Sequence, residues 1–150
     1  MLALSVFALL ACNDNESRNT KSSLTELQVI ELSALRFAMM AHAESGRERE
    51  YNHFYVIDRR EFLTYLEGFT PTVAIVDDKR FGRKNGVFLE LTTGKKAKLW
   101  EIGKTKIDQE SASVWITWYS ASLAGGGLAV KLEKIDGEWI PKSIVKGPIS

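Results

Sequence analysis

The second half of the chain alternates short β-forming segments with turn residues, and this pattern constrains the fold more than any other feature. Valine, isoleucine, tryptophan and threonine are frequent in the segments, as is typical of strands. Asn85-Gly86, Thr93-Gly94 and Asp136-Gly137 are the turn signals between them. The pattern predicts a meander of antiparallel strands at residues 73–76, 87–91, 97–107, 111–123, 128–135 and 139–145.

The details of this meander can also be predicted. A two-residue type I′ turn at Asp136-Gly137 places Lys134 opposite Trp139. Gly103 lies inside a long strand and indicates a β-bulge that bends the sheet. We expect the glycines 125–127 to form the turn between two strands, since no helix follows them to receive a phosphate. With the predicted register, one face carries Leu128, Val130, Leu132, Trp139, Ser143 and Val145.

The first part of the folded chain has a helical pattern instead. Ser23-Leu24-Thr25-Glu26 has the form of a capping box, with Ser23 as the N-cap. Apolar residues then recur at helical spacing until Gly46, and their broad stripe indicates a helix that a curved surface surrounds. We expect residues 51–57 to form a short strand. Asp58, with Glu61 three residues later, then predicts a second capping box at the start of a short helix.

A helix followed by a meander predicts a single α+β domain over residues 23–150, in which a long N-terminal helix packs on a curved antiparallel sheet. Its 150 residues, 45% apolar and 26% charged, fit one globular domain. The order of elements, the stretch 119–127, the Asp136-Gly137-Glu138-Trp139 hairpin and the final Ile149-Ser150 resemble cystatin-like and nuclear-transport-factor-like domains of small bacterial proteins. This resemblance implies a fold and carries no catalytic residue across.

The first twelve residues indicate where the protein is located. Residues 1–11 carry no charge, and as a helix they span roughly 15 Å, about half of a hydrocarbon core of ~30 Å. Leu9-Leu10-Ala11-Cys12 resembles the lipobox of bacterial lipoproteins. The resemblance implies a signal peptide over 1–11, cleavage before Cys12, and acylation, including palmitate, of its sulfur and amine. The alternative is an apolar N-terminal strand or helix with a buried free cysteine.

The polar residues 13–22 then act as a tether with a reach of ~18 Å, so the domain is held near a membrane. Asn13 stands where aspartate would retain a lipoprotein in the inner membrane of some Gram-negative bacteria. By this resemblance we expect a cell-envelope protein on the outer membrane, facing the periplasm.

The candidate site residues are scattered along the chain. One cysteine excludes an internal disulfide and a thiolate zinc site, and His42 and His53 lack any metal-binding pattern, so no metal or cofactor is expected. Glu90 and Glu101 lie within strands, where either could point into a pocket or into solvent. Trp115 and Trp118 are three positions apart, so they point to opposite faces and one of them is a candidate for ligand binding.

A basic patch is the other candidate site. Residues 77–106 contain nine basic and four acidic residues, although the whole chain has a net charge of only +1. The patch consists of Lys79, Arg80, Arg83, Lys84, Lys95 and Lys96. On a tethered domain it could meet anionic lipid, an acidic partner or a cell-wall polymer, and it could equally be a solvated edge. Nucleic acid is not an expected partner of an exported protein.

These observations favour a non-catalytic, lipid-anchored binding module for a partner protein or an apolar small molecule. Two alternatives remain open. The first is a small hydrolase or isomerase with a conical pocket between helix and sheet. The second is an inhibitor or immunity-type protein that acts through its hairpin loops.

Overall fold

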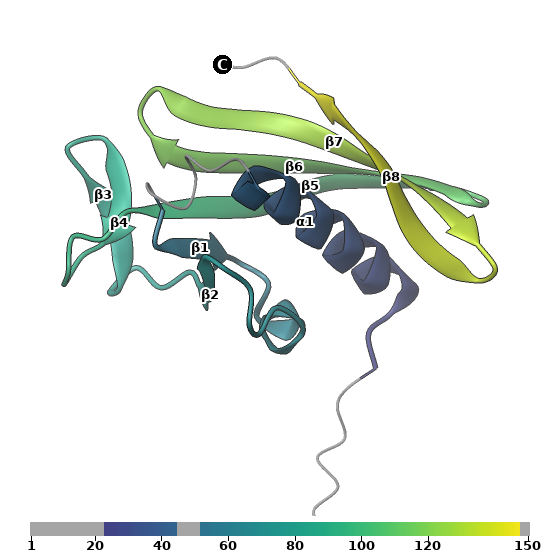
Figure 1. Ribbon diagram of the computed structural model, residues 1–150, viewed down its shortest axis with the longest axis horizontal. Coiled ribbons are helices and arrows are strands. Elements are labelled where there is room, and N and C mark those ends of the chain that lie inside the picture. The colour runs from purple at the N-terminus through teal and green to yellow at the C-terminus, as the bar shows by residue number, and fades with distance from the viewer. Residues whose placement is uncertain (1–22, 45–51, 148–150) are drawn as a thin grey trace, which may run out of the picture.

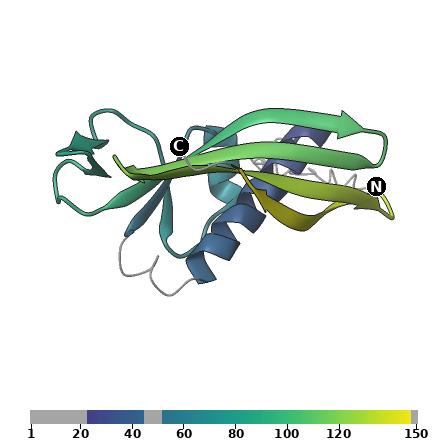
Figure 2. The ribbon, with the colours of Figure 1, turned by 90° about the horizontal axis from the view of Figure 1, so that it is seen from above.

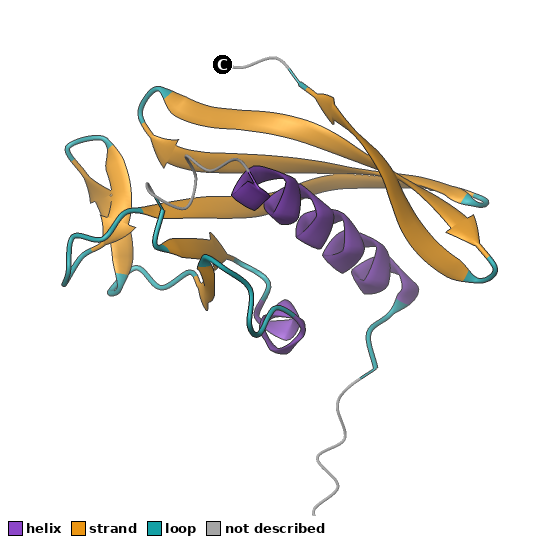
Figure 3. Cartoon of the chain, in the orientation of Figure 1, coloured by secondary structure: helices purple, strands orange, loops and turns teal. Residues whose placement is uncertain are grey.

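The computed structural model describes residues 23–44 and 52–147, and within them one α-helix packs on one face of an eight-stranded sheet (Figures 1 and 3). The predicted α+β class is therefore confirmed. Cys12, the tether, Gly46 and Ile149-Ser150 lie outside the described residues. The elements are α1 (Glu26–Glu44), β1 (Phe54–Ile57), the 3₁₀ helix η1 (Arg60–Tyr65), β2 (Thr72–Ile75), β3 (Phe81–Lys84), β4 (Val87–Glu90), β5 (Ala97–Asp108), β6 (Ser111–Ala121), β7 (Ala124–Ile135) and β8 (Glu138–Lys146).

The sheet is mixed rather than purely antiparallel. Strands β5 to β8 form the predicted antiparallel meander. Strand β1 instead pairs in parallel with both β5 and β2. The connection through η1 accounts for the first of these pairings, because it returns the chain so that β2 runs in the same direction as β1.

Strand β3 was not predicted, because Phe81–Lys84 is rich in charge and offers no clear apolar alternation. It pairs with β4 through a turn in which Asn85 and Gly86 both have positive φ, as a type I′ turn requires. The β3–β4 hairpin joins the sheet by single bridges from β4, Val87 to Ala121 of β6 and Leu89 to Lys96. It therefore lies at the end of the sheet where β5 begins.

The capping box of α1 lies two residues later than predicted. The Gln28 backbone N–H donates to Thr25 Oγ1 at 3.3 Å, and the Thr25 N–H donates to Gln28 Oε1 at 2.9 Å, so Thr25 is the N-cap in place of Ser23. Glu26 is thereby free to bind β7 and β8. The predicted cap at Asp58 is also wrong, since η1 follows Arg59, which makes no side-chain capping hydrogen bond.

Two irregularities decide which residues face the helix. The sheet has the predicted bulge at Gly103, where the β5–β6 register shifts between Ile102 and Thr105. The Asp136-Gly137 turn has positive φ at both residues and places Lys134 opposite Trp139, as predicted. A second bulge then shifts the β7–β8 register between Lys131 and Leu132. Ile144, rather than Ser143 and Val145, therefore packs against the helix-side core.

The glycines 125–127 lie within β7, so their prediction as a turn is wrong. Residues 122 and 123 make this turn instead. The tryptophans of β6 explain the glycines, because a Cβ on Gly126 would lie 3.2 Å from the Trp118 indole and one on Gly127 would clash with Trp115. The glycine run therefore makes room for two rings.

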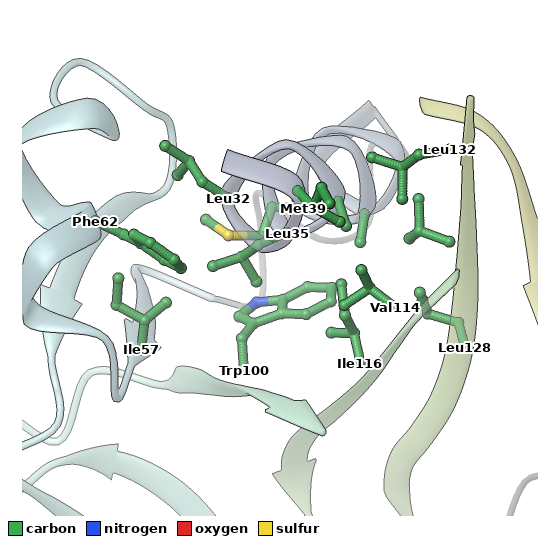
Figure 4. Packing of buried hydrophobic residues seen from close by; sticks show 14 of the residues in the cluster. Leu32, Leu35, Met39, Ile57, Phe62, Trp100, Val114, Ile116, Leu128 and Leu132 are labelled. Atoms are coloured by element: carbon green, nitrogen blue, oxygen red, sulfur yellow. The ribbon is translucent and has the colours of Figure 1, made fainter. Parts of the chain in front are cut away.

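The sheet has two separate apolar clusters, one on each face. The larger cluster fills the space between α1, η1 and the sheet, and Trp100, Leu35, Met39, Phe62 and Ile116 meet there (Figure 4). The smaller one lies on the opposite face beneath the β3–β4 hairpin and consists of Val56, Ala74, Phe81, Phe88 and Ala97. Figure 2, the view from above, shows that α1 crosses the strands of the sheet obliquely.

Candidate interaction surface at the β3–β4 hairpin

The structure places the predicted site residues in three different regions. Glu90 and the whole basic patch lie on β3, β4 and the turns next to them. Trp118 faces α1, whereas Trp115 and Glu101 lie on the face of β5–β8 opposite α1, which we call the open face. The prediction that the two tryptophans point to opposite faces is confirmed.

An ion pair fixes the base of the hairpin. Arg80 Nε donates to Glu90 Oε1 at 2.8 Å, and Thr93 Oγ1 donates to Glu90 Oε2 at 2.6 Å. Glu90 itself is only 8% exposed. The hydrogen bonds from Thr93 and Arg80 hold the pKa of the Glu90 carboxyl below its usual value, which outweighs the opposing effect of desolvation. Glu90 is therefore a structural carboxylate of the hairpin and is not aimed at the space beneath α1.

Aromatic rings hold the rest of the hairpin in place. The Arg80 guanidinium lies 4.9 Å from the centre of the Phe81 ring and 5.1 Å from that of Phe54. The Arg83 guanidinium lies 4.0 Å from the Tyr119 ring, whose hydroxyl donates to the Gly86 carbonyl at 3.0 Å. Each contact joins the hairpin either to itself or to the main sheet, so two of the predicted basic residues serve in packing as well as in charge.

Three lysines of the patch remain available for a partner. Lys79 and Lys95 lie at the base of the hairpin and Lys84 lies at its tip, all three exposed. None of the three forms an ion pair within the described part of the chain. Lys96 is exposed as well, and it makes further contacts. A rigid hairpin therefore presents ammonium groups to solvent.

The opposite end of the molecule, which we call the acidic end, carries more carboxylates than lysines. There Glu26, at the start of α1, accepts hydrogen bonds from Lys134 Nζ at 2.6 Å and from Trp139 Nε1 at 3.0 Å. The hydrogen bond from Lys134 is the largest cause of a lowered Glu26 pKa. The carboxylates at this acidic end are Glu26, Asp108, Glu110, Glu133, Asp136 and Glu138. Figures 1 and 2 both place the start of α1 and the hairpin at opposite ends of the molecule.

One residue of the basic run 77–106 lies in the interior of the protein. Lys98 belongs to the basic run, yet it is 1% exposed on the helix side of β5. Its Nζ lies 3.5 Å from His42 Nδ1 and 4.2 Å from the centre of the Trp118 ring. The signal was present in the sequence, because strand alternation places Lys98 on the same side as Trp100 and Ile102.

The remaining candidates do not converge on a reactive site. Glu101 and His53 are exposed. The His42 ring packs edge-on against Trp100 and Trp118, with centroid separations of 5.0 and 5.3 Å. A groove of about 330 Å³ between α1 and the loop after η1 is lined by Arg36, Met40, Tyr65 and Phe69 among others. It contains none of the predicted site residues.

Within residues 23–44 and 52–147, no group of three or more histidine, cysteine, aspartate or glutamate side chains is placed to hold a metal ion. In the same residues, no helix is long and apolar enough to span a membrane. No family model, curated protein or solved structure matches the chain.

Proposed function

We propose that this protein is a lipid-anchored, non-catalytic binding module of the bacterial cell envelope, and that its β3–β4 hairpin recognises an acidic surface on a partner protein. The observation that carries the proposal is the set of exposed lysines on the hairpin, Lys79, Lys84 and Lys95, held on a base that Arg80 and Glu90 fix. A hairpin backbone that is already held in place loses little conformational entropy when it binds.

The position of the hairpin favours a protein partner over the supporting membrane. In the proposal the chain enters the domain at the start of α1, after an acylated Cys12 and a ten-residue tether. The hairpin lies at the other end of β5, whose 12 residues span about 40 Å. A tether with a reach of ~18 Å therefore holds the acidic end nearer to the bilayer.

The fold proposal goes one step beyond the α+β class. A helix of 19 residues packs across the antiparallel strands β5 to β8, and a bulge interrupts β5 at Gly103. This arrangement supports the resemblance to cystatin-like and nuclear-transport-factor-like domains that we infer from the sequence.

The enzyme alternative receives less support. The space between α1 and the sheet is occupied by side chains of the larger apolar cluster, including Trp100 and Phe62. Glu90 and Glu101 lie outside that space, and a general base must lie within reach of a substrate.

Binding to a defined acidic probe tests the hairpin. Fluorescently labelled poly-L-glutamate is titrated with the full chain, and anisotropy is recorded at low and at high salt. We expect saturable, salt-sensitive binding that weakens about tenfold or more in the triple variant Lys79→Ala, Lys84→Ala, Lys95→Ala. The matched control is Lys106→Ala, Lys131→Ala, Lys142→Ala, which removes the same charge from the open face and the β7–β8 bulge.

Equal loss in the two triple variants would indicate non-specific attraction and contradict the proposal. Preferential binding to vesicles of anionic phospholipid over poly-L-glutamate would identify the membrane as the partner instead.

The lipid anchor has a separate test. The intact mass of the membrane-extracted protein should show acyl chains on Cys12, and Cys12→Ala should release the protein from the envelope. An unmodified chain that begins at Met1 contradicts the anchor.

A further inference from the structure

A row of ammonium and hydroxyl groups crosses the open face of the sheet at the end far from the hairpin. Cross-strand pairing aligns Lys106 with Ser113, Ser113 with Lys131, and Lys131 with Ser143. Four successive strands thus contribute one side chain each, at about 4.8 Å per strand. Lys131 Nζ donates to Ser113 Oγ at 3.2 Å, so the central pair is already ordered.

The row forms the floor of a groove of about 300 Å³. Asp108 and Glu133 complete one side of the groove, and Lys142 lies 3.8 Å from Glu133 in an ion pair. Three ammonium groups thus face two carboxylates, and the serine hydroxyls both donate and accept hydrogen bonds. The groove has nearly balanced charge, unlike the hairpin, so it does not favour a polyanion.

Trp115 adds an apolar surface next to this groove. It lies two residues from Ser113 on β6 and points to the same face, about 6.6 Å along the strand. Its indole crosses the neighbouring strands where only glycine leaves room, because a Cβ on Gly127 or on Gly147 would clash with the ring. The ring is half-buried and thus partly open to solvent.

We propose that this groove and Trp115 together bind a neutral oligosaccharide. A sugar presents hydroxyls that both donate and accept hydrogen bonds, which matches a floor of alternating ammonium, hydroxyl and carboxylate groups. Its C–H face packs on a flat indole, an apolar surface that also bears an N–H group. The Trp115 ring leans away from the lysine row, toward Gly127 and Gly147, so the ligand must have at least two sugar units to contact both.

The test is a titration of the isotope-labelled full chain with neutral oligosaccharides, namely those of N-acetylglucosamine, β-glucose, α-glucose and xylose, followed by NMR. At least one of them should shift the Trp115 indole N–H and the amides of Ser113, Lys131 and Ser143 saturably, with a dissociation constant of about 1 mM or below. We expect Trp115→Ala and Lys131→Met each to weaken this binding about tenfold.

The hairpin triple variant is the control, since it should bind the same sugar as the wild type does. Trp115→Phe keeps an aromatic ring over the glycines and guards against a folding defect in Trp115→Ala. The inference is overturned if no sugar of the panel shifts these signals, if the shifts centre on another surface, or if Lys131→Met and Trp115→Ala both leave the affinity unchanged. None of these results bears on poly-L-glutamate binding, so the two proposals fail separately.

Discussion

The two ends of the molecule are stabilised in different ways. At the hairpin end, Arg80 and Arg83 stack on aromatic rings above a small apolar cluster. At the acidic end, hydrogen bonds from Lys134 and Trp139 converge on Glu26 in the first turn of α1. The hairpin thus depends on packing and the acidic end depends on polar contacts and capping. The comparison shows that charged side chains are held by stacking on aromatic rings at one end and by hydrogen bonds to a helix terminus at the other.

The largest expected effect is at the hairpin end. Phe88→Ala removes a ring that stacks on Phe81 and packs edge-on against Tyr119. We expect a loss of about 3–5 kcal/mol in the free energy of unfolding, measured with denaturant, together with loss of poly-L-glutamate binding. Trp139→Phe at the acidic end should lower stability but preserve the binding. If Phe88→Ala leaves the binding intact, the hairpin does not depend on its apolar cluster.

A smaller effect is expected at the acidic end. Thr25→Ala removes the N-cap oxygen that accepts from the Gln28 backbone N–H. The expected loss is about 1 kcal/mol in the free energy of unfolding, with unchanged affinity for poly-L-glutamate. Ser23→Ala is the matched control and should have little effect, since Thr25 holds the cap. A larger loss for Ser23→Ala than for Thr25→Ala would restore the original sequence prediction.

Loss of a single hydrogen bond at the hairpin end should have an effect on stability similar to that of Thr25→Ala. Tyr119→Phe removes the hydroxyl that donates to the Gly86 carbonyl but keeps the ring beneath Arg83. We expect a loss of about 0.5–1.5 kcal/mol in denaturant unfolding and a modest weakening of poly-L-glutamate binding. Unchanged stability and binding would show that the turn at Asn85 and Gly86 is held by β3–β4 pairing alone.

The smallest expected effect is a change in how the stability of the protein depends on pH in the acidic range. The folded state lowers the pKa values of Glu26 and Glu90 from an ordinary value of 4.5. Their contribution to stability is therefore fully present above that value and is lost as the pH falls through the lowered pKa values. Thermal unfolding across this range should show a smaller acid-induced loss for Glu26→Gln and for Glu90→Gln than for the wild type. Identical pH profiles for all three proteins contradict this role.

Much of the fold was predictable because local signals agreed with it. The helix α1, the strands β5 to β8, the bulge at Gly103 and the Asp136-Gly137 turn all follow from periodicity and turn chemistry. Strand β3 and the parallel pairing of β1 were not predictable in this way. Their stabilising contacts, such as Arg83 on Tyr119 and β1 beside β5, join residues far apart in the sequence.

The candidate surfaces also divide into one that local sequence signals could predict and one that depends on contacts between distant residues. The basic patch could be found as a run of charge. Its arginines, however, could not be separated from its lysines without the aromatic rings on which the arginines stack. The open-face groove could not be found, since Lys106, Ser113, Lys131 and Ser143 become neighbours only through strand register. The shifts at the bulges make that register hard to infer from alternation alone.

The hairpin's anchor at Tyr119 has a consequence for shortened forms of the chain. The Tyr119 hydroxyl and the Gly86 carbonyl that it binds are separated by 33 positions in the sequence, so the contact closes a long loop that includes all of β5. A chain that ends before β6 lacks this hydrogen bond, the ring beneath Arg83 and the bridge from Val87 to Ala121. The tip of its hairpin, with Lys84, is then held by β3–β4 pairing alone.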